Sequence, residues 1–309
     1  MSLRTWLKRW LTGLGYPQEY LCLAETSPSN LRLWVESGGE ARDVTDEHLF
    51  VGYKPLLIGL LSVPVETGRI LVFHLRSEDG KSVAKLTAKT VFHQVLDNRS
   101  VVFCEGIRGS HTFIHPIYQW INRQRQWLTR RKPGNVGLPG NLYDQVRIAY
   151  AVPRIISVLI LSDGQRVNVF PTDLHGPVGL HHYVSSLRIH GKATEQVERL
   201  RKLVVADLTA HAYQEVYRWG VNHQRDLQQP DQYQWASHAS KNLGIPLPAG
   251  TIGYRELELE GSLDWGIHRI HFYRVLFHLQ ANGQPVTHIH QYYAQWRSDH
   301  GLVTGLLLR

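Results

Sequence analysis

Five side chains suited to binding a phosphate group occur within ten residues of one another. They carry hydroxyls or positive charges and are Ser185, Ser186, Arg188, Lys192 and Thr194. A dianionic phosphate is bound by hydroxyls, backbone amides and one or two cations, and a helix beginning near Thr194 would add free amides and a favourable dipole. The segment therefore predicts a phosphate site. The alternative is an ordinary strand followed by a capped helix, which the segment taken alone would favour.

A second segment, shortly before the first, could contact a flat ring. Residues 168–174 would offer backbone donors and acceptors at a strand end, because Pro171 prevents further strand pairing. Asp173 would place negative charge beside such a ring, and His175 could form a hydrogen bond with it. The two segments together predict a site for a ligand with a flat ring and a phosphate tail.

The sequence gives little support for a metal site or a common nucleotide motif. His288 and His290 lie two apart on an expected strand and could share a metal, but two histidines on a sheet face are the favoured interpretation. Cys22 and Cys104 are the only cysteines, which excludes a disulfide framework and a Cys-based zinc or iron–sulfur site. A P-loop is excluded because Leu75 stands where its first glycine is required, and no Rossmann fingerprint follows a strand.

The elements that must position these residues are mainly strands. In the second half of the chain they are expected at 155–161, 167–170, 182–189, 202–207, 254–260, 268–278 and 286–293. Helices are expected at 192–201 and 210–220. Hairpin turns between alternating strands, with few helices, predict an antiparallel barrel with peripheral helices.

The first half shows a similar pattern. Strands are expected at 31–36, 56–61, 69–76, 82–91 and 99–105, with a helix at 115–131. Residues 3–14 form an amphipathic helix that we expect to dock on its own domain rather than on a membrane. Residues 105–114 resemble 260–270, which suggests a duplication as one interpretation. We divide the chain into an N-terminal domain (1–131), a linker (132–140) and a C-terminal domain (141–309).

Composition places the chain among globular proteins that favour anionic partners. It has 309 residues, 34 Lys and Arg against 26 Asp and Glu, and a formal net charge of +8. The basic stretch Asn122 to Lys132 is interpreted as a solvated helix end. No signal peptide and no membrane span are visible, so we expect a cytoplasmic protein.

Residues 152–173 resemble the opening of the flavin reductase-like, FMN-binding split-barrel family, with its Pro-Arg strand, glycine turn and Asn-x-x-Pro strand end. Later pieces agree in order. Tyr183 to Arg188 resembles the strand before the phosphate-binding stretch, and Gly191 to Thr194 resembles the Lys-x-Thr element. Gly266 to Val275 resembles the late Gly-Asp-His strand. The resemblance covers roughly residues 145–280. Thr172 to His175 departs from it, because the family more often has a Ser and an aromatic there.

The resemblance implies a mainly β (α+β) split barrel with peripheral helices in the C-terminal half. The strand pattern predicts a smaller β-rich N-terminal domain before it, and the internal similarity suggests that this domain is a degenerate second barrel. It implies FMN, or alternatively FAD, with NAD(P)H as co-substrate. The expected cofactor contacts are Asn168, Phe170, Pro171, Thr172, Asp173, His175, Ser185, Ser186, Arg188, Lys192, Thr194 and His268. No catalytic side chain or metal ligand is assigned, because the flavin itself carries the hydride.

The predicted function is hydride transfer between NAD(P)H and flavin, in a homodimer or in a pseudo-dimer made with the N-terminal half. A non-catalytic flavin- or haem-binding split-barrel protein is the alternative. A third hypothesis is a nucleic-acid or membrane-surface module that uses Arg123 to Lys132 and the helix bearing Trp6 and Trp10. Nucleic acid is not among the predicted partners.

Overall fold

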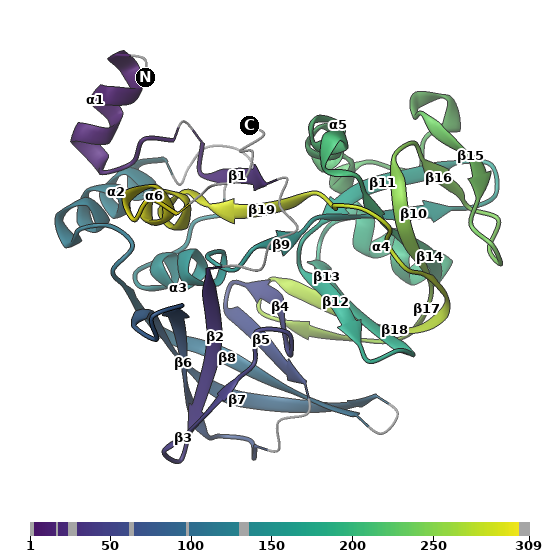
Figure 1. Ribbon diagram of the computed structural model, residues 1–309. Coiled ribbons are helices and arrows are strands. Elements are labelled where there is room, and N and C mark those ends of the chain that lie inside the picture. Colours follow the sequence, from purple (N-terminus) through teal and green to yellow (C-terminus); the bar gives the residue numbers. More distant parts are fainter. Residues whose placement is uncertain are drawn as a thin grey trace.

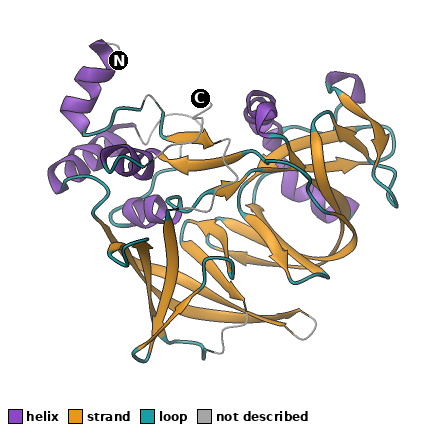
Figure 2. Ribbon diagram, in the orientation of Figure 1, coloured by secondary structure: helices purple, strands orange, loops and turns teal. Residues whose placement is uncertain are grey.

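Two seven-stranded antiparallel sheets form most of the molecule, and helices lie at its periphery (Figures 1 and 2). The computed structural model describes residues 3–16, 18–23, 30–61, 65–96, 99–129 and 136–302. The prediction of a mainly β protein with peripheral helices is confirmed. It follows from long segments in which buried and exposed residues alternate with a period of two.

The C-terminal sheet has the strand order β11-β10-β14-β17-β18-β13-β12. Its strands are β10 (Ser157–Ser162), β11 (Val167–Thr172), β12 (His175–Val178), β13 (His182–Arg188), β14 (Lys202–Leu208), β17 (Thr251–Trp265) and β18 (His268–Leu279). Helix α4 (Lys192–Leu200) joins β13 to β14. A helical stretch of η1 (Ala210–Ala212), α5 (Tyr213–Arg218) and η2 (Trp219–Gln224) follows β14. After a short turn η3 (Pro230–Gln232) comes the hairpin of β15 (Trp235–Ala239) and β16 (Pro246–Pro248).

The N-terminal sheet has the order β3-β2-β6-β7-β8-β5-β4. Its strands are β2 (Leu31–Ser37), β3 (Glu40–Asp43), β4 (His48–Tyr53), β5 (Leu56–Leu61), β6 (Ile70–Ser77), β7 (Ser82–Leu96) and β8 (Arg99–His111). The sequence patterns predicted five of them. They missed β3 and β4, because β3 is a short and largely exposed edge strand and β4 is buried without alternation.

The two sheets have the same topology. Taken in chain order, β2 to β8 occupy the positions that β10 to β14, β17 and β18 occupy in the other sheet. The predicted duplication is therefore present in the strand order. The sequence similarity that suggested it is out of register, because Gly109 and His111 end β8 whereas Gly266 and His268 stand at the beginning of β18.

The two halves pack against each other through equivalent strands. One hydrophobic cluster combines side chains of β4, β5 and β8 with side chains of β12, β13 and β18. Phe103 of β8 meets Phe272 of β18, its topological counterpart, edge to face with ring centroids 6.2 Å apart. A contact between equivalent surfaces is the arrangement expected of a twofold-symmetric dimer. Here it lies within a single chain.

Segments from both ends of the chain lie beside the N-terminal sheet (Figure 1). Strands β1 (Tyr20–Leu23), β19 (Thr287–His290) and β9 (Arg154–Ile155) form a small sheet, flanked by helices α2 (Pro116–Thr129), α3 (Leu142–Ala149) and α6 (Gln291–Asp299). The strand expected at 286–293 is wrong beyond His290. The Nδ1 atom of His290 accepts a hydrogen bond from the Tyr292 amide and caps α6, which begins at Gln291.

The hydrophobic core of the N-terminal sheet also contains residues from the predicted C-terminal domain. Val146 and Ile148 of α3 and Tyr292 and Tyr293 of α6 belong to the same cluster as the N-terminal sheet. Residues 130–135, within or beside the predicted linker, lie outside the described residues. The division at 132–140 stays a prediction.

Helix α1 (Leu3–Thr12) differs from its expected role. The prediction that it docks through its apolar face is wrong for most of that face, because Trp6, Leu7, Trp10 and Leu11 are about half exposed. Leu14, after the helix, is fully buried. None of the helices in the described ranges is long and apolar enough to cross a membrane.

Candidate functional site

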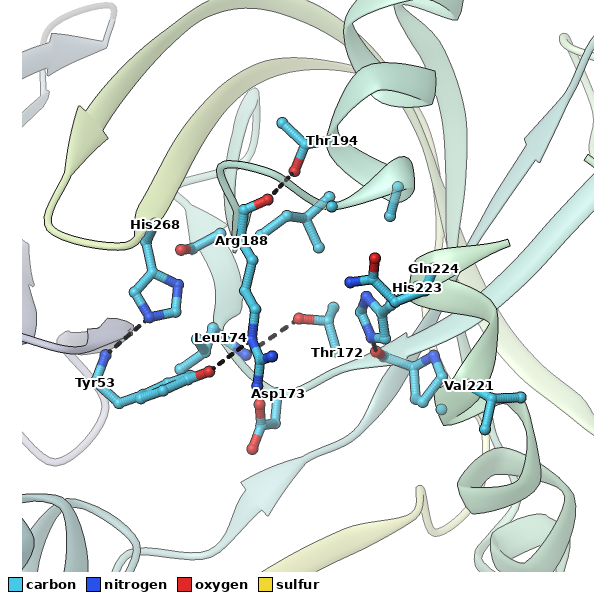
Figure 3. A pocket seen from close by; sticks show the side chains of 16 residues that line it. Tyr53, Thr172, Asp173, Leu174, Arg188, Thr194, Val221, His223, Gln224 and His268 are labelled. Carbon is cyan, nitrogen blue, oxygen red and sulfur yellow. Dashed lines mark hydrogen bonds between the residues drawn. The ribbon is translucent and has the colours of Figure 1, made fainter. Parts of the chain in front are cut away.

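A cavity of about 350 Å³ lies where the two halves of the chain meet (Figure 3). The end of β11, the end of β13, the first turn of α4, η2 and the start of β18 surround it, and Tyr53 at the end of β4 contributes from the N-terminal half. Its volume is in the range of small-molecule sites. Its lining residues are Tyr53, Pro171, Thr172, Asp173, Leu174, Ser186, Leu187, Arg188, Gly191, Ala193, Thr194, Gly220, Val221, His223, Gln224 and His268.

One side of the cavity presents hydrogen-bond donors and a positive charge. The Ser186 hydroxyl is buried and has no partner in the described part of the chain. The Thr194 hydroxyl donates to the Arg188 carbonyl at 2.7 Å, which ties the start of α4 to the end of β13. The backbone amides of Lys192 and Ala193, in the first turn of α4, have no acceptor among the residues described. These groups form an environment suited to an anion.

Arg188 connects the C-terminal half to Tyr53. Its Nε donates to the Tyr53 hydroxyl at 2.9 Å (Figure 3). Burial raises the pKa of Tyr53, although the charge of Arg188 opposes this rise. Tyr53 therefore remains a neutral phenol near pH 7 and can orient the guanidinium toward the cavity.

His268 adds a second unpaired donor. The Tyr53 amide donates to its Nε2 at 3.3 Å, so that the neutral ring carries its proton on Nδ1. Nδ1 is buried and has no partner in the described structure. Burial, aided by the charge of Arg188, lowers the pKa of His268 to about 4. At neutral pH the ring is uncharged and can donate one hydrogen bond into the cavity.

Asp173 forms part of the cavity wall opposite these donors, and its carboxylate pairs with a histidine outside the cavity. Its Oδ2 lies 2.8 Å from Nε2 of His288 on β19. Burial alone would raise the pKa of Asp173, but the hydrogen bond and charge of His288, with Arg154 and Tyr150, hold that pKa well below its usual range. Asp173 is therefore ionised at neutral pH. Residues 171–173 also line a smaller cavity of about 170 Å³ beside Tyr217 and His288.

His223 fixes the end of strand β11. Its Nε2 donates to the Pro171 carbonyl at 2.7 Å, and its ring lies against Phe170 with centroids 4.8 Å apart. Burial lowers the pKa of His223. The neutral ring therefore donates to a carbonyl near the end of an edge strand.

Seven of the twelve cofactor contacts expected from the sequence line this cavity. They are Pro171, Thr172, Asp173, Ser186, Arg188, Thr194 and His268. The strand end and the phosphate segment, separated by a hairpin in the sequence, are thus brought to one place by the pairing of β12 with β13.

The other five expected residues lie elsewhere. Asn168 is buried and donates to Gln196 at 2.8 Å, and Phe170 belongs to a hydrophobic core. His175 contacts the Tyr183 hydroxyl at 2.5 Å, and Ser185 lies 3.0 Å from the Tyr273 hydroxyl. Lys192 points to Glu195 and Asp226 at 3.5 and 3.7 Å. Alternation along β13 explains the difference between Ser185 and Ser186, since successive side chains face opposite sides.

Sequence reasoning missed the residues that reach the cavity from distant elements. Tyr53 comes from the other half of the chain, and no periodic pattern links it to Arg188. His223 and Gln224 end η2, beyond the helix expected at 210–220. The internal similarity between the two halves could have placed Tyr53 near the C-terminal site, because the halves pack through equivalent strands. The similarity seen in the sequence, however, aligned residues that are not equivalent in the structure.

His288 and His290 do not share a ligand position in this structure. His288 pairs with Asp173, whereas Nε2 of His290 lies 3.6 Å from Glu19. Among the residues whose placement is described, no group of three or more His, Cys, Asp or Glu side chains could hold a metal ion.

No protein-family model and no curated protein matches the sequence. Solved structures do show similarity. An NADH:FAD oxidoreductase of Streptomyces globisporus aligns with 52% of this chain and 95% of its own, at 14% identity and a TM-score of 0.43. The styrene monooxygenase flavin reductase of Pseudomonas putida aligns with 48% of this chain and 92% of its own, at 17% identity and a TM-score of 0.39. An FMN-binding protein of Thermus thermophilus aligns with 41% of this chain and 72% of its own, at 19% identity and a TM-score of 0.36.

Proposed function

We propose that this protein is a flavin-dependent oxidoreductase that binds FMN in the cavity between its halves and uses NAD(P)H as reductant. The observation that carries the proposal is the set of donors on one side of that cavity. The Ser186 hydroxyl, the first amides of α4 and the Arg188 guanidinium lie together there. Such a set suits a dianionic phosphate.

The chain's own residues have distinct roles in this proposal. Ser186 and the amides of Lys192 and Ala193 hold the phosphate, and Arg188 supplies the positive charge. Thr194 acts indirectly, because its hydroxyl donates to the Arg188 carbonyl and so fixes the start of α4. The backbone of residues 171–174 contacts the ring, with the neutral Nδ1–H of His268 as an additional donor. The bound flavin would supply the hydride chemistry. The protein positions it and limits its contact with water. FAD is the alternative cofactor.

The proposal gives one cofactor site to each chain. In the N-terminal half, the connection equivalent to α4 runs between β5 and β6, in residues 62–69, and its described part contains no helix. The surface that pairs the two halves is already buried within one chain. Both features favour a pseudo-dimer over the predicted homodimer. We place the protein in the cytoplasm because Cys22 and Cys104, the only cysteines, do not form a disulfide with each other.

The test is a flavin titration of the purified full chain. We expect a flavin absorbance spectrum or, for protein isolated without cofactor, a melting temperature that rises with added FMN. Under anaerobic conditions NADPH or NADH should then bleach the absorbance of the bound flavin. A protein that shows neither a spectrum nor a thermal shift would overturn the proposal. Bound flavin or haem without NAD(P)H oxidation would favour the non-catalytic alternative.

A further inference from the structure

Two helices remote from the cavity form a surface that the proposed function leaves unexplained. Helices α1 and α2 are joined by a 2.8 Å hydrogen bond from the side-chain amide of Asn122 to the backbone carbonyl of Thr12. They also approach closely at Gly13, where a Cβ atom would overlap the ring of Tyr118. The C-terminal end of α1 therefore packs on α2, and α1 projects at the edge of the molecule (Figure 1).

The outer faces carry large apolar side chains. On α1, Trp6 and Trp10 are 52% and 64% exposed, one helical turn apart. On α2, Trp120 and Trp127 are 59% and 56% exposed, two turns apart. Leu7, Leu11, Ile117 and Leu128 are also exposed. We call these eight residues the tryptophan patch. So many large exposed apolar side chains on two neighbouring helices indicate an interaction site.

The segments that carry the tryptophan patch are rich in cations. No acidic residue occurs in residues 1–18 or 106–143, whereas Lys8, Arg9, Arg123 and Arg125 lie on the two helices. Burial lowers the pKa of Lys8 and the charge of Arg125 lowers it further, whereas the charge of Glu19 opposes this change. Arg9 pairs with Asp299 and Arg123 with Asp144.

We propose that the tryptophan patch binds the surface of an anionic lipid bilayer, with α1 and α2 lying in the interfacial region. Tryptophan prefers the interface between hydrocarbon and water, and cations beside it are attracted to acidic headgroups. A convex, projecting helix suits a flat lipid surface. Nucleic acid would leave the leucines and the isoleucine without a role, because phosphate contacts need cations and base stacking needs only the aromatic rings.

The test is co-sedimentation of the full chain with vesicles. We expect binding to vesicles of phosphatidylcholine with 30% phosphatidylglycerol, weak binding to phosphatidylcholine alone, and weaker binding at high salt. The double substitution Trp6→Ser with Trp10→Ser should weaken binding at least about tenfold. Arg125→Gln should weaken it about fivefold. Leu180→Ser, a change of a highly exposed leucine between β12 and β13, is the matched control and should leave binding unchanged.

Several outcomes would overturn the proposal. One is the absence of binding to anionic vesicles at low salt, and another is binding that survives the double tryptophan substitution. Preferential binding to duplex DNA over vesicles would favour the nucleic-acid hypothesis instead. Circular dichroism of each variant should match the parent, so that a lost interaction is distinguishable from a lost fold. FMN binding is measured on the same samples and is expected to be unaffected.

Discussion

The Nε atom of Arg188 donates a 2.9 Å hydrogen bond to the hydroxyl of Tyr53, and this bond links the two halves of the chain at the mouth of the cavity. Tyr53 also fixes the tautomer of His268 through its backbone amide. A single residue of the N-terminal half thus orients two polar groups of the C-terminal half. The cavity is complete only when both halves are present.

Replacing Tyr53 by Phe removes the hydroxyl but keeps the ring that packs edge to face on His268. We expect FMN affinity to fall about threefold to tenfold, because Arg188 loses the bond that holds it toward the cavity. The fold should be unaffected. Titration of FMN fluorescence measures the change, and an unchanged dissociation constant would show that Tyr53 does not orient the cation.

Arg188 and Lys192 were both expected to contact the cofactor, but the structure separates them. Arg188→Met should weaken FMN binding about tenfold to a hundredfold, because a charge-assisted bond to the phosphate is lost. Lys192→Met should have little effect, since Lys192 faces Glu195 and Asp226 outside the cavity. Isothermal titration of both variants provides the comparison. Equal losses would contradict the placement of the phosphate at Arg188.

The adjacent serines of β13 give a pair of opposite expectations. Ser186→Ala should weaken FMN binding without lowering the free energy of unfolding, because its buried hydroxyl has no protein partner in the described structure. Ser185→Ala should leave FMN affinity unchanged but cost about 1 kcal/mol of stability, because its hydroxyl bonds to Tyr273. Urea denaturation combined with FMN titration separates the two effects. A loss of stability in the Ser186 variant would argue that its hydroxyl bonds to the protein and is not available to the cofactor.

Gly266 lies where the β17–β18 turn meets the N-terminal half. Its φ is +60°, and a Cβ atom there would overlap the Lys54 carbonyl and the ring of Pro55. Gly266→Ala should therefore destabilise the fold by at least about 2 kcal/mol. Gly164→Ala is the control, because its φ of +92° is strained in the same way but open space surrounds it. Similar denaturation midpoints for both variants would show that contact between the halves contributes little.

Buried histidines should make the fold sensitive to acid. Burial lowers the pKa of His268, His48 and His290 to about 4 in the folded protein, against 6.5 for an unperturbed histidine. Between about pH 6.5 and 4 the unfolded chain binds protons that the folded chain does not. The free energy of unfolding should then fall as pH falls, by about 1.4 kcal/mol per pH unit for each such group.

Urea denaturation at pH 7.5, 6.5 and 5.5 measures this slope. His268→Asn should make the slope shallower between pH 6.5 and 5.5, because one group no longer contributes. A midpoint that stays constant from pH 7.5 to 5.5 would mean that these rings are solvated or already protonated.

Local patterns in the sequence account for most strands and for part of the site. Alternating residues predicted β17 and β18, and the segment from Ser186 to Thr194 predicted a strand followed by a helix start with phosphate-binding groups. These features depend on residues close in sequence, and their backbone geometry follows from local preference and periodicity. The strand expected at 286–293 was extended three residues too far. His290 caps helix α6, and the first turns of that helix are buried, so their apolar residues resemble those of a strand.

The amino-acid sequence alone determined the strand-rich class, the types of side chain around residues 168–194 and the amphipathic character of α1. Which face of β13 meets the cavity, the arrival of Tyr53 beside Arg188 and the exposure of Trp6 and Trp10 were decided only by the tertiary structure. The physical reason is that these depend on how two topologically equivalent sheets pack together. That packing is a sum of many weak, non-local contacts, such as Phe103 with Phe272, and no short stretch of sequence contains it.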